Sequence, residues 1–147
     1  MYTNALDETE LQTFVSYWFN QAKSNSRDWY VQVDLHGGEN SAVSKPAADS
    51  TAYAHRDYLL MYLLYDRVDK GEYPAEGHTY MANFASNITQ SMDRADWGMY
   101  INYADSRLSQ KDAQVNYWGG NLPRLQAIKK AVDPEDVFHY PQGVLPA

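Results

Sequence analysis

The stretch WYVQVDLHGG, residues 29–38, decides the fold class because its residues alternate between apolar and polar types. The apolar members are Trp29, Val31, Val33 and Leu35. The polar members are Tyr30, Gln32 and Asp34. This period of two predicts a half-buried β-strand over 29–36, broken by Gly37-Gly38, with its apolar side packed under helices. The pattern taken by itself favours solvent over a site for the polar side.

Helical spacing appears on both sides of this strand. Residues 7–23 carry apolar side chains three and four apart, and Asp7 followed by Glu10 resembles a capping box. Further helices are expected over 78–94 and 121–131, the last with Asn121 as its cap and Pro123 in its first turn. Only a single helical turn is expected over 112–117.

The remaining segments predict one more buried strand and several irregular stretches. The apolar run YLLMYLLYDR, residues 58–67, favours a strand, although periodicity alone leaves a helix open. Residues 39–54 predict a long ordered loop, and 97–108 predict a strand or an irregular aromatic segment. The fold class is therefore α+β, with helices covering one face of a mainly antiparallel sheet. About three strands make a small sheet for a domain, so further strands are expected outside this chain.

The composition limits the partners of the chain. Its 147 residues, 44% of them hydrophobic, fit one globular domain. The formal net charge is −7 and no basic stripe is present, which argues against a nucleic-acid partner. No apolar run reaches the length of about 18 residues that a membrane span needs. The start MYTNALDETE lacks the features of a signal peptide, whereas the glycosylation triplet at Asn87 weakly favours secretion.

General chemical motifs are scarce. The chain has no cysteine, which excludes disulfides, thiolate ligands and a cysteine nucleophile within it. The four histidines show no metal-ligand spacing, so no metal site is predicted; they are His36, His55, His78 and His139. The segment GGNLPRL, residues 119–125, resembles a glycine-rich phosphate turn but lacks the spacing of a nucleotide motif.

The second half of the chain carries a set of spaced motifs. These are YINYADSRL at 100–108 and NYWGGNLPRLQAIKKAVDPEDVFHYPQGV at 116–144, preceded by HGG at 36–38 and STAYAHRD at 50–57. Together they resemble the C-terminal part of berberine-bridge-type FAD-linked oxidases. The joint spacing is more specific than any single piece, and the resemblance runs from about residue 29 to the end. It implies a vanillyl-alcohol-oxidase-like substrate domain, with its C-terminal portion at 1–98 and the family's C-terminal segment at 99–147.

The sugar-oxidising branch of the family offers roles for the residues of both motifs. Gluco- and chito-oligosaccharide oxidases carry an aromatic-x-Gln-x-Asp strand over the flavin, which Tyr30, Gln32 and Asp34 match. The resemblance implies that Tyr103 is the catalytic base, assisted by Asp34, and that Tyr30 and Gln32 bind the sugar. Tyr100 and Asn102 are then expected beside the cofactor. Where the family strand usually has Trp, this chain has the smaller Tyr30.

The implied reaction oxidises the anomeric carbon of an oligosaccharide to a lactone and yields hydrogen peroxide from dioxygen. The implied cofactor is FAD, held mostly by an N-terminal flavin domain that has no counterpart in this sequence. The chain alone is accordingly expected to bind FAD weakly and to lack activity, and the full-length protein is expected to be secreted. Two alternatives stay open: a carbohydrate- or small-ligand-binding module without redox activity, and an oxidase of an alkaloid or aromatic alcohol.

Overall fold

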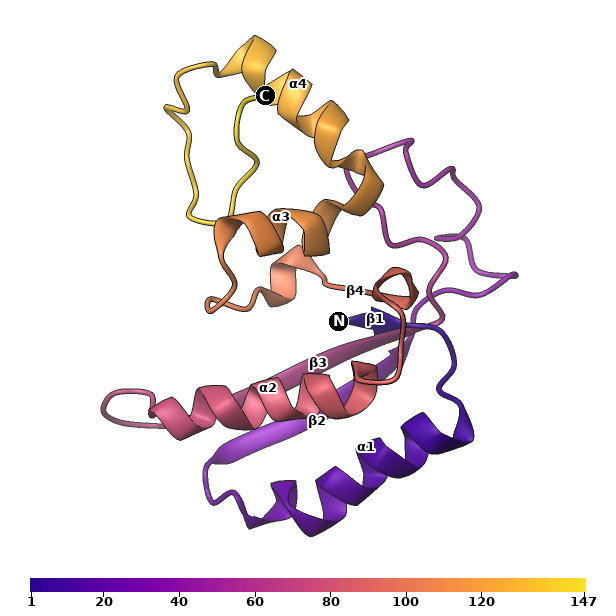
Figure 1. Cartoon of the computed structure of the whole chain (residues 1–147), viewed down its shortest axis with the longest axis vertical. Helices are drawn as coiled ribbons and strands as arrows, with labels where there is room; N and C mark the ends of the chain where they lie inside the picture. The colour runs from indigo at the N-terminus through magenta and orange to yellow at the C-terminus, as the bar shows by residue number, and fades with distance from the viewer.

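The computed structural model describes all residues from 1 to 147 and confirms the α+β class (Figure 1). Its elements in chain order are β1 (Tyr2–Thr3), α1 (Glu8–Asn20), β2 (Asp28–Leu35), β3 (Leu60–Arg67), α2 (Ala75–Thr89), β4 (Trp97–Gly98), α3 (Gln110–Trp118) and α4 (Leu122–Val132). The sheet is antiparallel, with the strand order β2-β3-β1-β4. None of the helices combines the length and apolar character needed to cross a bilayer.

Helix α1 begins where the sequence predicts, because Asp7 and Glu10 form a complete capping box. Asp7 accepts a hydrogen bond from the Glu10 amide, and the Glu10 side chain accepts one from the Asp7 amide. Helix α2 begins three residues earlier than expected, directly after Pro74. Its end at Thr89 places the glycosylation triplet inside the last turns, where Ile88 is fully buried.

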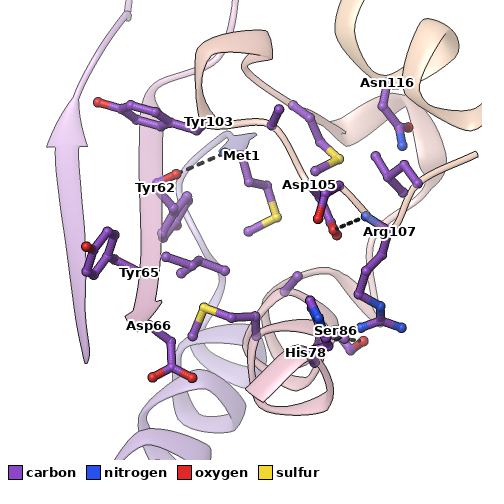
Figure 2. Close-up of a pocket in the computed structure, with 18 of the residues that line it drawn as sticks. Met1, Tyr62, Tyr65, Asp66, His78, Ser86, Tyr103, Asp105, Arg107 and Asn116 are labelled. Atoms are coloured by element: carbon purple, nitrogen blue, oxygen red, sulfur yellow. Dashed lines mark hydrogen bonds between the residues drawn. The ribbon is translucent and has the colours of Figure 1, made fainter. Parts of the chain in front are cut away.

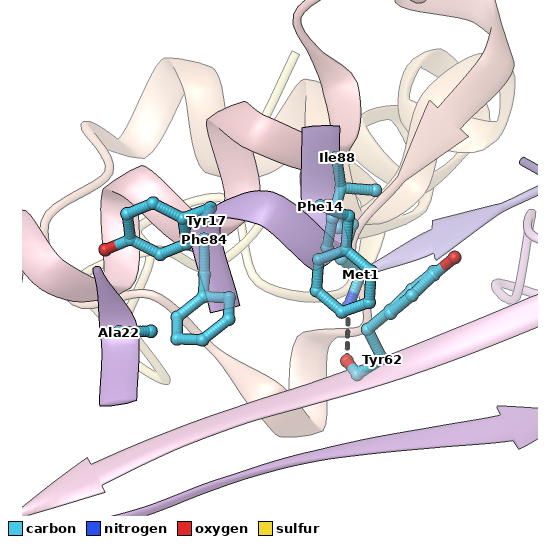
Figure 3. Packing of buried hydrophobic residues seen from close by; sticks show 7 residues of the cluster. All are labelled: Met1, Phe14, Tyr17, Ala22, Tyr62, Phe84 and Ile88. Atoms are coloured by element: carbon cyan, nitrogen blue, oxygen red, sulfur yellow. Dashed lines mark hydrogen bonds between the residues drawn. The ribbon is translucent and has the colours of Figure 1, made fainter. Parts of the chain in front are cut away.

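The core lies between the sheet and the helix pair α1 and α2, which run along one face (Figure 3). Its buried members are Met1, Phe14, Tyr17, Ala22, Tyr62, Phe84 and Ile88. Phe84 is the centre of this cluster, since its ring contacts those of Phe14, Tyr17 and Trp29. Burial of these aromatic surfaces is the main stabilising contribution in this half of the molecule.

The apolar side of β2 is only half covered, which corrects the expectation for that strand. Trp29 and Val31 pack against the core as predicted. Val33 and Leu35 remain 44% and 82% exposed, because the core beneath the sheet does not extend to this end of β2. The alternation identified the strand correctly but did not show how far the covering helices extend.

The C-terminal helices pack beyond β1 and β4, on the side of the sheet away from β2 (Figure 1). Helix α3 spans nine residues, so the expectation of a single turn over 112–117 was wrong. The Ser109 hydroxyl caps this helix by accepting a hydrogen bond from the Asp112 amide. The prediction missed the helix because its apolar residues show little helical periodicity. Helix α4 ends at Val132, within one residue of the predicted end, and Pro134 beyond it cannot continue the helical hydrogen bonds.

Candidate functional site

The sheet face turned away from α1 and α2 gathers the residues of the period-two strand. In the antiparallel pairing Tyr30, Gln32 and Asp34 lie opposite Tyr65, Leu63 and Met61 of β3. Paired residues in such a ladder project to the same side, so these six side chains share one surface. We call this surface, made of Tyr30, Gln32, Asp34, Met61, Leu63 and Tyr65, the site face.

One end of the site face is an aromatic platform. The rings of Tyr30 and Tyr65 stack with their centroids 4.8 Å apart and their planes 19° apart. Tyr30 stays 44% exposed, so one side of the pair is open to a ligand. A stacked pair held this way offers flat apolar area together with hydroxyl groups.

The middle of the site face carries a fixed amide–carboxylate pair. The Gln32 Nε2 donates to both Asp34 oxygens, at 3.0 and 2.9 Å. Gln32 is exposed and Asp34 is half-buried. The pair therefore holds the carboxylate in one orientation while leaving the Gln32 carbonyl and the outer lone pairs of Asp34 for a polyhydroxylated ligand.

Beyond Asp34 the site face continues into a buried aromatic cluster around Tyr2. Tyr2 pairs with Met61, which also pairs with Asp34, so the Tyr2 side chain projects to the same side of the sheet. The Tyr2 ring is 1% exposed and contacts the rings of His36, Tyr53, His55, Tyr58 and Tyr100. Burial raises the pKa of the Tyr2 hydroxyl, so this phenol stays protonated.

The two histidines of this cluster serve as hydrogen-bonding groups. The Tyr53 hydroxyl donates to the His55 carbonyl at 3.0 Å and lies 2.6 Å from the His36 Nε2. The His55 Nε2 in turn donates to the Tyr117 carbonyl at 2.9 Å. Burial lowers the pKa of both imidazoles, so both are neutral near pH 7. A neutral His36 with its proton on Nε2 then donates to the Tyr53 oxygen.

Tyr100 and Tyr103 bracket a single turn of 3₁₀ helix over Ile101–Tyr103. Their rings meet edge to face with centroids 5.2 Å apart, and Asn102 Nδ2 donates to the Tyr100 hydroxyl at 2.8 Å. The Tyr100 ring contacts the Tyr2 ring, so this turn lies on the same side of the sheet as Asp34. Tyr103 is half-buried and lines a cavity of about 810 Å³, where Figure 2 shows it pointing away from Arg107 and Asn116. No hydrogen bond joins Tyr103 to Asp34.

The turn that bears Tyr103 is clamped from the far end of the chain. Gln142 is 4% exposed, and its Nε2 donates to the carbonyls of Asp105 and Leu108 at 2.7 and 3.1 Å. The Tyr117 hydroxyl donates to Gln142 Oε1 at 2.9 Å and accepts a hydrogen bond from the Asp105 amide. These bonds fix the backbone two residues after Tyr103, so the closing tail braces this turn.

The long loop predicted over 39–54 lies between β2 and β3, and the C-terminal motifs also brace it. Arg124 donates to the Asp49 carbonyl at 3.0 Å. Asn121 occupies the N-cap position of α4 as predicted, but its side chain makes no capping hydrogen bond; its Nδ2 instead donates to the carbonyls of Ala48 and Thr51. Gly119 has φ +48°, a conformation that favours glycine at the end of α3.

Several contributors to this site lack a sequence signal of their own. Tyr65 became a partner of Tyr30 only through the register of β2 and β3, which a period-two count over 58–67 does not supply. Tyr2 lies in a two-residue strand, too short for any pattern. Tyr53 lies in the long loop, inside the STAYAHRD motif, where its contact with His36 depends on the tertiary structure.

Comparisons with known proteins match this architecture. Residues 99–145 match the family model described as "Berberine and berberine like". A xylooligosaccharide oxidase of Thermothelomyces thermophilus is 42% identical over 148 residues, which covers 99% of this chain and 30% of that protein. The structure of a chitooligosaccharide oxidase superposes with a TM-score of 0.96 at 39% identity, covering 99% of this chain and 31% of the other.

A third similar protein is described together with its cofactor. It is the glucooligosaccharide oxidase of Acremonium strictum, whose structure is described with a 6-S-cysteinyl, 8α-N1-histidyl FAD. That structure superposes on this chain with a TM-score of 0.91 at 40% identity, covering 99% of this chain and 32% of the other. The chain thus spans about 30% of the length of the relatives it matches. Over nearly its whole length the chain is therefore similar to the C-terminal part of berberine-bridge-type FAD-linked oxidases, and residues 99–145 match that family's model.

Proposed function

We propose that this chain forms the substrate-facing part of an FAD-linked oxidase that converts the anomeric C1 of an oligosaccharide to a lactone, with dioxygen reduced to hydrogen peroxide. The observation that carries the proposal is the site face, where an open aromatic platform adjoins a fixed amide–carboxylate pair. Flat apolar area beside directed acceptors suits a sugar ring with its hydroxyl groups. The oligosaccharide substrates named for the relatives support the same class.

In this proposal the platform and the pair divide the binding of the sugar. Tyr30, braced from behind by Tyr65, packs against the face of a sugar ring. Gln32 and Asp34 then bind its hydroxyls. Because their mutual hydrogen bonds already fix both side chains, less side-chain entropy is lost when the sugar binds. The single ring of Tyr30 covers less area than a Trp indole, so we expect weaker stacking per sugar unit than a Trp there would give.

Tyr103 is proposed as the group that takes the proton of the C1 hydroxyl. Oxidation of this carbon removes one hydride and one proton, and the proton needs an acceptor near the reacting carbon. A phenol has an ordinary pKa of about 10, so Tyr103 enters the step protonated and can take the C1 hydroxyl proton only if it passes its own hydroxyl proton to a second group. Asp34, half-buried on the same side of the sheet, is the carboxylate proposed to accept a hydrogen bond from Tyr103 once substrate orders the site, and to receive the phenol proton as Tyr103 takes the proton of the C1 hydroxyl.

The residues of this chain fit the substrate side of a flavin site and offer little to hold the cofactor. The chain has no cysteine for a thioether link, and His36 and His55 are already engaged in hydrogen bonds. We therefore propose FAD as the cofactor, contacted by Tyr100 and Asn102 and held mainly by a flavin-binding domain of the same protein. When bound, FAD accepts the hydride from C1 and passes the two electrons to dioxygen.

Secretion of the full-length protein is proposed together with glycosylation of Asn87. The Asn87 side chain is half-buried and donates to the Asn83 carbonyl within α2. Treatment of the secreted protein with a peptide N-glycosidase tests the proposal: a loss of one glycan mass at Asn87 supports it, and an unmodified Asn87 refutes the glycosylation.

The function is tested with the longer protein that joins this chain to its flavin-binding part. The purified protein is mixed with xylo-, cello- and chito-oligosaccharides, and both hydrogen peroxide and the sugar product are measured. The proposal predicts peroxide and aldonic acid in equal amounts, since each lactone hydrolyses to the acid. Sugar binding without peroxide would identify a binding module instead. Peroxide formed only with an aromatic alcohol or an alkaloid would overturn the sugar assignment.

A further inference from the structure

The edge of β3 facing away from β2 is open along most of its length. Strand β1 pairs with β3 only through Tyr2 and Thr3, opposite Met61 and Leu60. One further rung follows, because the Met1 amino group donates to the Tyr62 carbonyl at 2.9 Å and the Tyr62 amide donates back at 2.7 Å. Past Tyr62 no element pairs with this edge of β3.

The backbone groups left open can be identified from the ladder. Because Tyr62 exchanges both of its hydrogen bonds with Met1, alternate residues of β3 direct their amides and carbonyls to the same side. Leu64 and Asp66 therefore point theirs away from β2. Backbone donors and acceptors that line a partly buried space are normally paired in a folded protein.

These groups border the cavity of about 810 Å³ that Tyr103 also lines (Figure 2). Its other walls are α2 and the 103–108 segment, and the small side chains of Ala82 and Ala85 leave room along α2. The lining includes Leu64 from the helix side of the sheet and Tyr65 from the site face. The cavity therefore lies beside the open edge of β3 and reaches both sides of the sheet. A further strand paired with β3 would occupy this position.

We propose that the β3 edge from Leu63 to Asp66 is the docking site of an extended segment attached to the amino side of Met1, which continues β1 antiparallel to β3. The register follows from the Met1–Tyr62 rung. Counting back from Met1, the first four residues lie opposite Leu63, Leu64, Tyr65 and Asp66. The second and fourth then bond Leu64 and Asp66 and face the helices, whereas the first and third join the site face.

Two further observations favour this occupant over an unrelated partner. The existing β1–β3 rungs already set the direction and register of such a segment, and the matched relatives are about three times as long as this chain. The Met1 nitrogen is also buried at the head of the cavity, and this burial lowers the pKa of its amino group to about 5. A peptide amide in its place carries no charge to desolvate.

The proposal is tested by extending the 147-residue chain. One extension, Val-Thr-Val-Thr ahead of Met1, places Val at the two bonded positions facing the helices. The matched control, Pro-Thr-Pro-Thr, lacks the amides needed at those two positions. Amide hydrogen exchange is measured at Leu64 and Asp66. We expect at least about tenfold slower exchange with the first extension than with the control or the unextended chain. Equal exchange in all three would overturn the proposal.

A cross-link tests the register independently of exchange rates, and the absence of native cysteines makes it unambiguous. In the first extension the third residue before Met1 is changed to Cys together with Tyr65→Cys, and a disulfide is expected to form in air. In the control, Tyr65→Cys is kept and the second residue before Met1 is changed to Cys instead. The side chain of that residue points to the other side of the sheet. Bridging in the control alone, or in neither, refutes the register. Protection of Leu64 in a dimer of the unextended chain would assign the edge to a second copy.

Discussion

The clamp on the Tyr103 turn gives a prediction that the 147-residue chain can test directly. Gln142→Leu keeps a side chain of similar size but removes every polar atom from a nearly buried position. It deletes two donated hydrogen bonds, to the Asp105 and Leu108 carbonyls, and one accepted from Tyr117. The surrounding groups keep their positions and lose their partners.

The expected loss follows from these three bonds. A hydrogen bond of this kind contributes about 1 kcal/mol net, and a buried partner left unpaired costs about 1–3 kcal/mol. Because Leu recovers some free energy by burying apolar surface, we expect the free energy of unfolding to fall by about 2–4 kcal/mol. With a urea m-value of about 2 kcal/mol/M, the midpoint should fall by about 1–2 M.

The assay is equilibrium urea unfolding followed by tryptophan fluorescence, since the chain has four Trp residues. Gln90→Leu is the matched control: Gln90 is exposed at the end of α2, and its side chain makes no hydrogen bond. The control should change the free energy of unfolding by less than about 0.5 kcal/mol. If Gln142→Leu is as mild as this control, the tail does not hold the turn.

A double-mutant cycle separates the clamp from general packing. Tyr117→Phe removes the hydroxyl that donates to Gln142 and accepts from the Asp105 amide. Because both variants break the same Tyr117–Gln142 bond, the double variant should lose about 1 kcal/mol less than the sum of the single losses. Strict additivity would contradict the shared network.

Three further changes test the rest of the fold. Burial raises the pKa of Asp66, but the hydrogen bonds from Arg27, Tyr73 and Asn25 together outweigh it and hold that pKa below 3.8. The stabilisation from these bonds is therefore complete above pH 3.8 and is lost as the pH falls through the folded pKa. Asp66→Asn should therefore cost about 1–3 kcal/mol at pH 7 in urea unfolding, and the difference from wild type should shrink as the pH falls below 3.8. Phe84→Ala should cost about 3–5 kcal/mol in the same assay, because Phe84 is fully buried among aromatic rings; a loss below 1 kcal/mol would contradict that role. Tyr53→Phe, which leaves His36 and the His55 carbonyl unpaired, should cost about 1–3 kcal/mol; an unchanged urea midpoint would contradict the pairing.

The period of two in residues 29–36 was sufficient to predict β2 and the shared side of Tyr30, Gln32 and Asp34, because side-chain direction in a strand is a local property. How far the apolar side is covered depends on where α1 and α2 pack, which is a tertiary property. Val33 and Leu35 were therefore assigned to the core and are exposed.

The site shows the same division between local and tertiary information. The motif around Tyr103 could be located from its spacing, and the grouping of Tyr100 with Asn102 follows from one turn of chain. The contact of Tyr100 with Tyr2 joins residues 98 positions apart and depends on the sheet order. Helix α3 was underestimated because its Ser109 cap stabilises a helix with little apolar periodicity.

The central claim is that Tyr103 takes the substrate proton in the longer, flavin-containing protein, and the rate of flavin reduction by an oligosaccharide tests it most directly. Tyr103→Phe removes only the hydroxyl, and Tyr140→Phe, at an exposed position in the tail, is the control. We predict that stopped-flow absorbance shows reduction slowed by about 10²–10⁴-fold for Tyr103→Phe with sugar affinity little changed, and no change for the control. Reduction at the wild-type rate in Tyr103→Phe would contradict the account.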